Sequence, residues 1–221
     1  MTDVDTYPVS PDDYFAGAYI DWRNKRIAKI ESIFGREFFS GKTVLELGCG
    51  YGHLGKYFHE ELGSDVTFAE GNEAYISRIQ HNNPNSEVLH LDQDKAYDLK
   101  KKFDVVIHFG VLYHLNDWKQ DLKCALNHTD LMILESEVAN SENPEFELKY
   151  IDHQAYDQAV NRIASRPSAS YIESVLTEQG FTFVRYDDAD LDSGFHRYSW
   201  TVNEGGPQGT GMRRFWIVRK A

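Results

Sequence analysis

The feature that most constrains the fold is an alternation of strand-like and helix-like segments that begins at residue 43. The segment 103–109 (FDVVIHF) is apolar enough to form a strand buried on both faces. Strands that alternate with helices form parallel sheets with right-handed crossovers. We therefore predict an α/β fold with a seven-stranded, mostly parallel sheet, helices on both faces and an antiparallel last strand. The expected strands are 44–47, 65–69, 88–91, 103–109, 131–135, 181–186 and 215–219, and the helices are 53–62, 73–80, 118–126 and 168–179.

The whole chain, residues 1–221, is predicted to form a single domain. Residues 1–40 precede the first strand and contain an expected helix at 13–34, which would cap the sheet. Two longer polar and aromatic segments, 139–166 and 188–212, interrupt the alternation as inserts. Ligands of such folds bind beyond the carboxyl ends of the strands, so we expect these inserts to shape a substrate site or a lid over it.

Charge and cysteine content exclude several classes of function. The 35 acidic and 23 basic residues leave a net charge of −12, which disfavours nucleic acid as a partner and favours a small molecule. No apolar run is long enough to span a membrane, and the polar start MTDVDTYPVS does not resemble a signal peptide. Cys49 and Cys124 lack metal-ligand spacing, so no metal is expected and a cytoplasmic location is the default. The oligomeric state stays open.

A glycine loop follows the first strand. Gly48, Gly50 and Gly52 lie between this strand and the next helix, where glycine lets the backbone turn sharply and approach a ligand. Gly50, Gly52 and Gly55 also spell the dinucleotide motif GxGxxG, but that register starts two residues after the strand ends. An acid at position 46 is also unusual for that motif.

The segment Glu46-x-Gly48-x-Gly50-x-Gly52 instead resembles the first motif of class I S-adenosylmethionine-dependent methyltransferases, which have a Rossmann-like fold. The resemblance implies S-adenosylmethionine as cofactor. Glu70 would accept the ribose hydroxyls, Asp92 would lie near the adenine amino group, and the backbone at 108–110 would contact the methionine. Trp22 would cover the cofactor with its aromatic face. The implied cofactor residues are Trp22, Glu46, Gly48, Gly50, Gly52, Glu70, Gly71, Asp92, Gln93, His108 and Phe109.

Three segments resemble a narrower family, the methyltransferases that modify wobble uridine in tRNA with a carboxymethyl group from carboxy-S-adenosylmethionine. They are GVLYHL (110–115), LESEV (134–138) and RPSASYIESVLTEQGF (166–181). That family holds the extra carboxylate with a Lys, a Tyr and an Arg. The resemblance implies that Tyr113 supplies the Tyr, Lys25 or Arg26 one cation, and Arg213 or Arg214 the other. These arginines belong to the basic cluster MRRFWIVRK, which is equally well a strand's solvent face.

Methyl transfer requires alignment of the acceptor, which supplies roughly 7–11 kcal/mol, and often a general base, which adds about 10²–10⁴-fold. The candidate bases are His114, Glu137 and His153, although His114 is as well explained by a helix start and Glu137 by a solvated loop. Tyr150, His153 and Tyr156 are spaced by three and are expected on one helix face. The candidate substrate-binding residues are Tyr113, Tyr150, Tyr156, His196, Tyr198, Arg213 and Arg214.

Three functions are compatible with these observations. The first is an S-adenosylmethionine-dependent methyltransferase that acts on a hydroxyl or amine of a small molecule. The second is a tRNA wobble-uridine carboxymethyl-transferring enzyme that uses the carboxylated cofactor. The third is a nucleoside-binding protein without catalysis.

Overall fold

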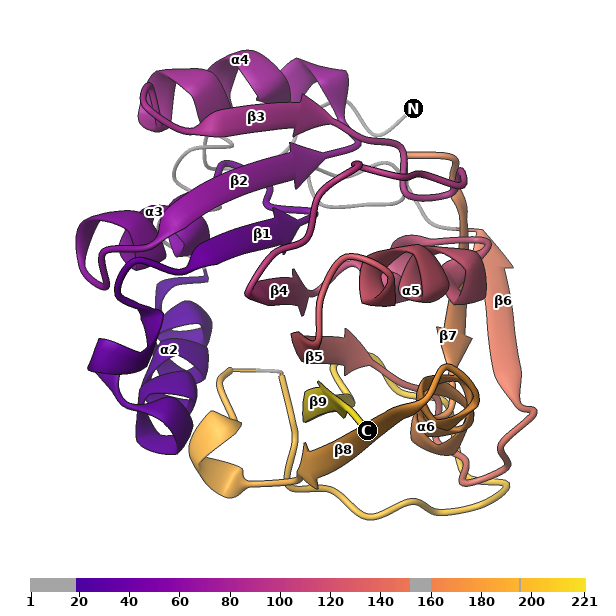
Figure 1. Ribbon diagram of the computed structural model, residues 1–221. Coiled ribbons are helices and arrows are strands. Elements are labelled where there is room, and N and C mark those ends of the chain that lie inside the picture. The colour runs from indigo at the N-terminus through magenta and orange to yellow at the C-terminus, as the bar shows by residue number, and fades with distance from the viewer. Residues whose placement is uncertain (1–18, 152–159, 195) are drawn as a thin grey trace.

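The computed structural model describes residues 19–151, 160–194 and 196–221. It contains a seven-stranded sheet in the order β3-β2-β1-β4-β5-β9-β8 (Figure 1). The neighbouring strands from β3 to β5 pair in parallel, whereas β9 runs antiparallel to both β5 and β8. This topology confirms the predicted sheet and its antiparallel last strand. The strands are β1 (Thr43–Leu47), β2 (Asp65–Glu70), β3 (Glu87–His90), β4 (Val105–Phe109), β5 (Leu131–Glu137), β8 (Phe181–Tyr186) and β9 (Arg213–Lys220).

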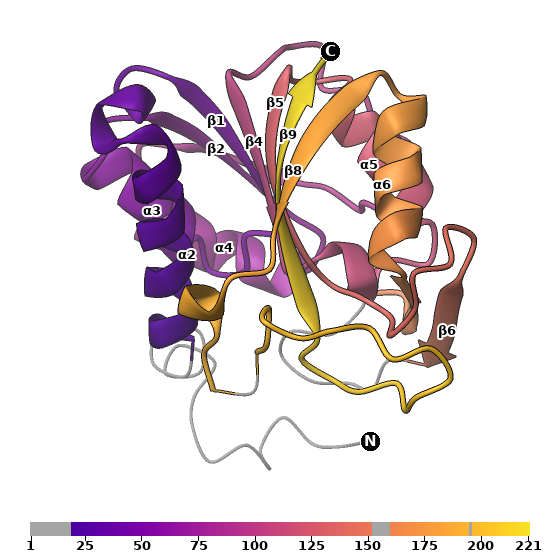
Figure 2. The same cartoon turned by 90° about the horizontal axis from the view of Figure 1, so that it is seen from below.

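Helices cover both faces of the sheet, as predicted. One face packs against α2 (Ile20–Phe34), α3 (His53–Glu60) and α4 (Glu73–Asn82), and the other against α5 (Trp118–Leu126) and α6 (Ala169–Glu178) (Figure 2). Because both faces of the central strands are buried, β4 and β5 have no exposed residue. Within the described residues, no helix has the length and apolar character to cross a membrane.

Local sequence signals begin and end several helices. The side chains of Asn72, Asp117 and Ser168 accept hydrogen bonds from the first turns of α4, α5 and α6. Gly180 follows α6 with φ +78, the left-handed conformation that glycine adopts without strain. The predicted helix 168–179 is therefore confirmed, and α6 is one residue shorter than predicted at each end.

The first insert contains a second, two-stranded sheet in which β6 (Glu147–Ile151) pairs antiparallel with β7 (Ile163–Pro167). The predicted helix face is wrong for Tyr150, which lies in β6 opposite Ala164. Pairing with a strand 14 residues away in sequence overrides the local three-residue spacing. The remaining members of that predicted face, His153 and Tyr156, lie outside the described residues.

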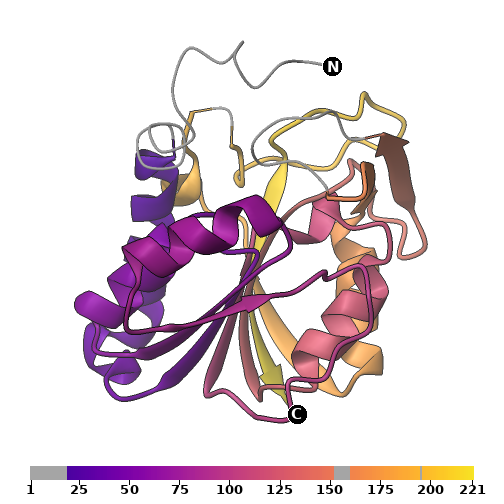
Figure 3. The same ribbon diagram turned by 90° about the horizontal axis from the view of Figure 1, so that it is seen from above.

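Short 3₁₀ turns connect the larger elements. They are η3 (Arg36–Phe39), η4 (Leu112–His114) and η5 (Ala189–Leu191). The described parts of both inserts gather at the end of the sheet to which the parallel strands point (Figure 3). In the second insert, Asn140 holds the loop before β9. Its side-chain oxygen accepts a hydrogen bond from the backbone amide of Asn203 at 2.8 Å, and its backbone amide donates to the side-chain oxygen of Gln208 at 2.8 Å. The functional end of the fold is therefore built from loops and from the start of β9.

Candidate functional site

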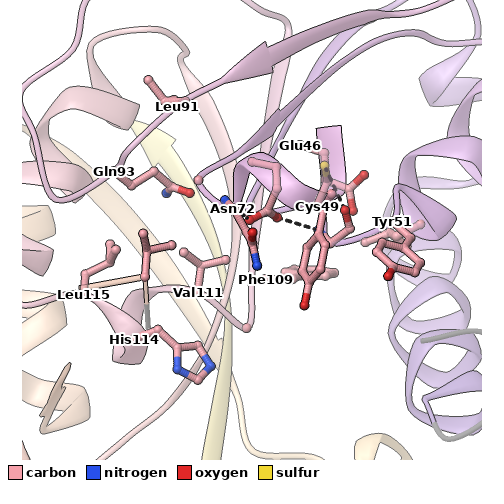
Figure 4. Close-up of a pocket in the computed structure, with 18 of the residues that line it drawn as sticks. Glu46, Cys49, Tyr51, Asn72, Leu91, Gln93, Phe109, Val111, His114 and Leu115 are labelled. Atoms are coloured by element: carbon pink, nitrogen blue, oxygen red, sulfur yellow. Dashed lines mark hydrogen bonds between the residues drawn. The ribbon is translucent and has the colours of Figure 1, made fainter. Parts of the chain in front are cut away.

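A cavity of about 180 Å³ opens at the carboxyl ends of β1, β2, β3 and β4 (Figure 4). The loop after each of these strands contributes to its wall, and α2 and η4 close its sides. In this position parallel α/β sheets bind their ligands. The predicted residues that line the cavity are Trp22, Glu46, Gly48, Gly50, Glu70, Gly71, Asp92, Gln93, Phe109, Tyr113 and His114.

Gly48 fixes the shape of the glycine loop at the end of β1. It has φ +61, and a Cβ atom there would lie 1.9 Å from the Val111 Cγ2 atom. A side chain at this position would have to displace the Val111 side chain in the loop after β4. Gly52 also has a positive φ, but it serves as the N-cap of α3 and does not line the cavity.

Glu46, in β1, connects this strand to the helix that follows the glycine loop. Its Oε2 atom accepts a hydrogen bond from the Gly55 amide in α3 at 2.9 Å. Burial raises the pKa of Glu46 to about 8, although the guanidinium groups of Arg26 and Arg23 oppose the shift. Glu46 therefore binds α3 to the end of β1, and its carboxyl group is held by the protein's own backbone.

Glu70 lies at the end of β2 and joins two loops across the cavity. One carboxylate oxygen accepts from the Gly50 amide at 2.8 Å and the other from the Asn72 amide at 2.9 Å. Burial raises the pKa of this carboxyl group, while these backbone hydrogen bonds oppose the shift. Each carboxylate oxygen keeps capacity for a further hydrogen bond, so Glu70 can accept a pair of hydroxyl groups from a ligand.

The loop after β3 places Asp92 and Gln93 side by side with different partners. The Asp92 carboxylate accepts from the Asp94 amide at 3.1 Å and pairs with Lys95 at 3.0 Å. Gln93 is buried and donates its side-chain amide to Asp121 at 3.0 Å. Both residues line the cavity, but Asp92 is held by its own loop.

The predicted cofactor residues His108 and Phe109 point in different directions. Phe109 lines the cavity, whereas the His108 side chain is fully buried on the other face of β4, where its Nε2 atom lies 2.6 Å from the Asp121 carboxylate. Successive side chains of a strand point to opposite faces, and this alternation takes His108 away from the cavity. The His108 imidazole is thus not part of the cavity wall.

Beside the cavity lies a buried ion cluster centred on Glu135 in β5. The Glu135 carboxylate accepts from Arg213 at 2.9 Å and from the Tyr198 hydroxyl at 3.1 Å, and lies 3.6 Å from the Arg26 guanidinium. Glu135 itself is 0% exposed, so both arginines depend on it for charge compensation. We call Glu135, Arg26, Arg213, Tyr198 and Tyr113 the Glu135 cluster.

Tyr113 connects this cluster to the cavity, because its hydroxyl accepts a hydrogen bond from Arg213 at 2.8 Å. Burial raises the pKa of Tyr113, so its hydroxyl keeps its proton. Arg213 also lies 3.6 Å from Glu137, which in turn pairs with Arg166 at 2.6 Å. Of the two arginines of β9 that the resemblance implied as a possible cation, Arg213 is therefore the one in contact with Tyr113.

Arg214 faces the other way. Its guanidinium donates to the carbonyls of Tyr198 and Trp200 and pairs with Asp187. The neighbouring arginines of β9 thus separate, because alternate residues of a strand point to opposite sides. Arg214 and Tyr198 do not line the cavity.

The candidate bases have unequal access to the cavity. His114 lines it and lies 4.1 Å from the Tyr113 ring, centroid to centroid. Glu137 is buried between Arg166 and Arg213 and is absent from the cavity wall. Of the three predicted bases, only His114 is therefore placed to contact a ligand within the described part of the chain.

The remaining predicted substrate residues support the walls. Tyr150 donates its hydroxyl to the Tyr113 carbonyl at 3.1 Å. His196 stacks on Trp22 at 3.9 Å, and burial together with the nearby arginines lowers its pKa to about 3. Arg26 also stacks on the Trp22 ring at 3.8 Å, so Trp22 serves as a packed wall instead of offering a free aromatic face.

Sequence reasoning assigned no role in the site to Glu135, Asp121 or Arg23. Arg23 lines the cavity one turn of α2 from Arg26. For Glu135 a signal did exist: two acids at alternate positions, 135 and 137, end a strand that is otherwise apolar. Charged residues at the buried end of a strand require partners of opposite charge. The strand β9 supplies such a partner, because Arg213 lies opposite Glu137 in the register of the sheet.

The sheet order, the glycine loop and the acid at the end of β2 together define the class I S-adenosylmethionine-dependent methyltransferase fold. Solved structures with this fold include the N-terminal domain of EvdMO1 in the presence of SAH and D-fucose, at 16% identity and a TM-score of 0.66, covering 91% of this chain and 83% of that chain. An S-adenosylmethionine-dependent methyltransferase from Mesorhizobium loti matches at 13% identity and a TM-score of 0.62, covering 89% and 98% of the two chains. The plantazolicin methyltransferase BpumL, in complex with a triazolic desmethylPZN analog and SAH, matches at 14% identity and a TM-score of 0.61, covering 96% and 95%.

The family model for the methyltransferase domain matches residues 19–186. The chain therefore belongs to the methyltransferase domain family, and its fold is that of the S-adenosylmethionine-dependent methyltransferases. No protein with curated annotation gives a significant sequence match.

Proposed function

We propose that this protein transfers a methyl group from S-adenosylmethionine to a hydroxyl or amine of a small molecule. The observation that carries the proposal is the Glu70 carboxylate, held at the cavity between the amides of Gly50 and Asn72 with acceptor capacity to spare. A ribose offers two adjacent hydroxyls that match this pair of oxygens. The small-molecule acceptor is supported by two structural neighbours, one determined in the presence of D-fucose and the other in complex with a triazolic desmethylPZN analog.

The cavity residues fit the other parts of the cofactor. Gly48 leaves no Cβ between the loop backbone and a ligand. Arg26 is buried, lines the cavity and has an Nε atom with no hydrogen-bond partner among the described residues. A positively charged guanidinium on the cavity wall suits the carboxylate of the amino-acid part, and Arg23 brings a second positive charge to the same wall.

When bound, S-adenosylmethionine supplies a methyl group already activated by its sulfonium centre. The protein must then align the acceptor and remove its proton. His114 is the residue we assign to proton removal, because it is the predicted base that lines the cavity. The protonated Tyr113 hydroxyl, polarised by the hydrogen bond from Arg213, is a donor available to the acceptor molecule.

Calorimetry with S-adenosylhomocysteine, S-adenosylmethionine and NAD tests the cofactor assignment. We expect both sulfur nucleosides to bind, and Glu70→Ala to weaken them by about 1.5–3 kcal/mol, since a charged hydrogen-bonding group is lost. Glu73→Ala is the matched control, because this exposed residue of α4 does not line the cavity. Binding of NAD without binding of the sulfur nucleosides would refute the assignment.

The base assignment has its own test. Once a methyl acceptor is found, His114→Gln should lower kcat by about 10²–10⁴-fold at unchanged cofactor affinity. An unchanged kcat would show that the acceptor loses its proton without His114. Tight cofactor binding with no turnover of any acceptor would instead favour the non-catalytic alternative.

A second candidate function is carboxymethyl transfer to tRNA from carboxy-S-adenosylmethionine. The contact between Tyr113 and Arg213, with Arg26 nearby, favours it, because a Tyr and two cations could bind an extra carboxylate. Two acidic groups weigh against it, since Arg213 already faces both Glu135 and Glu137.

Mass spectrometry of the nucleoside retained on purification distinguishes the two donors. If the second candidate is right, the carboxylated donor should also bind at least about tenfold more tightly than S-adenosylmethionine, and Tyr113→Phe should remove that preference. Arg214→Ala is the control, because Arg214 faces away from the cavity. Equal affinities for the two donors would leave the ordinary methyl donor as the cofactor.

A further inference from the structure

A short segment of the first insert, just before β7, lies along one end of the cavity. Val160 in this segment lines the cavity, although 55% of it is exposed. Its Cγ2 atom lies 3.3 Å from the place that a Cβ atom would take at Gly71, so the segment packs closely on the loop after β2. Figure 1 shows the same segment beside the loop after β3. We call residues 160–162 the strap.

One carboxylate, that of Asp94, fastens the strap to the loop after β3. Its Oδ2 atom accepts a hydrogen bond from the side-chain amide of Asn161 at 2.9 Å. Its Oδ1 atom accepts from the backbone amides of Asn116 and Asp117 at 2.8 and 3.1 Å, and Asp117 is the N-cap of α5. Asp94 is therefore held in place by the start of a helix. Asn161 itself is exposed and does not line the cavity.

The backbone of the strap is strained where it joins β7. Arg162 has φ +62, the left-handed conformation that is unfavourable for a residue with a Cβ atom. Such strain persists where neighbouring contacts hold the chain, and it is found at segments that clamp ligands. The hydrogen bond of Asn161 and the packing of Val160 hold the strap closed, whereas the strain at Arg162 favours opening. These opposing contributions are small, so the strap can open and close without unfolding the sheet.

We propose that the strap gates the cavity, so that its opening sets the rates at which the cofactor enters and the product nucleoside leaves. The inference rests on the proposed function, because it assumes that the ribose binds at Glu70, next to Gly71. The contacts that close the strap are made within the chain, so they form with or without a ligand. Entry and exit then depend on the same open fraction. Asp94 and Asn161 act as positioning residues for this gate.

The exchange of S-adenosylhomocysteine tests the proposal. A chase of the radiolabelled nucleoside with excess unlabelled nucleoside gives the dissociation rate constant, calorimetry gives Kd, and their ratio is the association rate constant. In Asn161→Ala we expect both rate constants to rise roughly threefold to tenfold, because one hydrogen bond that closes the strap is lost, while Kd stays within about twofold. Asn161→Asp sets a carboxylate against Asp94 and should raise both rate constants at least as much.

Two further variants provide a control and a change of opposite sign. Asn143→Ala is the matched control, because Asn143 is an exposed residue of the same insert that accepts from the Glu145 amide at 2.9 Å and does not line the cavity. Its rate constants should equal those of the wild type. Arg162→Gly adopts the left-handed conformation without strain, so it should stabilise the closed strap and slow both entry and exit.

The pattern of the rate constants distinguishes a gate from a simple contact. Loss of a simple contact raises only the dissociation rate constant and weakens Kd by the same factor. That result, or unchanged rate constants in both Asn161 variants, overturns the gate while the cofactor assignment stands. Rate constants that do not fall in Arg162→Gly overturn the role of Arg162. If the wild type does not bind S-adenosylhomocysteine, the proposed function fails and the inference fails with it.

Discussion

Replacing Glu135 by Gln should strongly destabilise the protein, although the two side chains have the same size and shape. Glu135 is 0% exposed and compensates the charge of Arg213 at 2.9 Å and of Arg26 at 3.6 Å. A neutral amide of the same shape leaves two buried guanidinium groups with less counter-charge. Breaking a buried ion pair on one side costs about 3–5 kcal/mol, a large part of the roughly 5–15 kcal/mol that stabilises a typical domain.

Urea unfolding of the wild type and Glu135→Gln at pH 7 measures this cost. Glu60→Gln is the matched control, because Glu60 pairs with Lys56 at 3.7 Å on the surface, where such a pair contributes at most about 1 kcal/mol. The double variant Glu135→Gln/Arg213→Met should be more stable than Glu135→Gln, since one uncompensated charge has been removed. A loss for Glu135→Gln no larger than that of the control would refute the reasoning.

Three further predictions concern stability. Gly48→Ala should cost about 2–4 kcal/mol in urea unfolding, from its positive φ and the clash with Val111, whereas Gly41→Ala, with similar φ and open space, should cost less. Because burial raises the pKa of Glu46 from 4.5 to about 8, its contribution to stability is complete below pH 4.5 and is lost as pH rises through 8. The free energy of unfolding of Glu46→Gln, relative to that of the wild type, should therefore rise by up to about 1.4 kcal/mol per pH unit between pH 4.5 and 8. A difference between the two proteins that does not change with pH would contradict the raised pKa. His196 changes stability with pH in the opposite direction. Because its pKa is lowered in the folded protein, the unfolded chain binds a proton at a higher pH, so the free energy of unfolding falls as pH drops from 6.5 toward 3. In urea unfolding, His196→Phe should therefore lose less stability than the wild type over this pH range.

Much of the fold could be predicted because its signals are local. The helix 118–126 and the strand 181–186 have the same bounds in the structure as in the prediction. The strand β5 extends two residues further than predicted, to Glu137, because β9 pairs with those residues and satisfies their backbone groups. Tyr150 shows the opposite case, where a local spacing compatible with a helix gave way to pairing with Ala164.

Those site residues whose positions depend on neighbouring residues in the chain could also be predicted from the sequence. Gly48, Gly50 and Glu70 line the cavity where the motif placed them, since a strand, its turn and the next strand end are set by neighbouring residues. The sheet face toward which a side chain near a strand end points was harder to predict. His108 lies one residue before the end of the expected strand, and the strand's alternation takes its ring to the opposite face, toward Asp121.

The sequence by itself determined the parallel sheet, the glycine loop and the acid at the second strand, because alternation, turn chemistry and strand ends depend on residues close together in the chain. Only the tertiary structure decided that Glu135 compensates Arg213, 78 positions away, and that Asp121 accepts a hydrogen bond from Gln93, 28 positions away. A buried charge or amide takes whichever partner the packing of distant elements brings within about 3 Å, and no local pattern specifies that partner. The chemistry of the cavity therefore depends on contacts that exist only after the sheet has assembled.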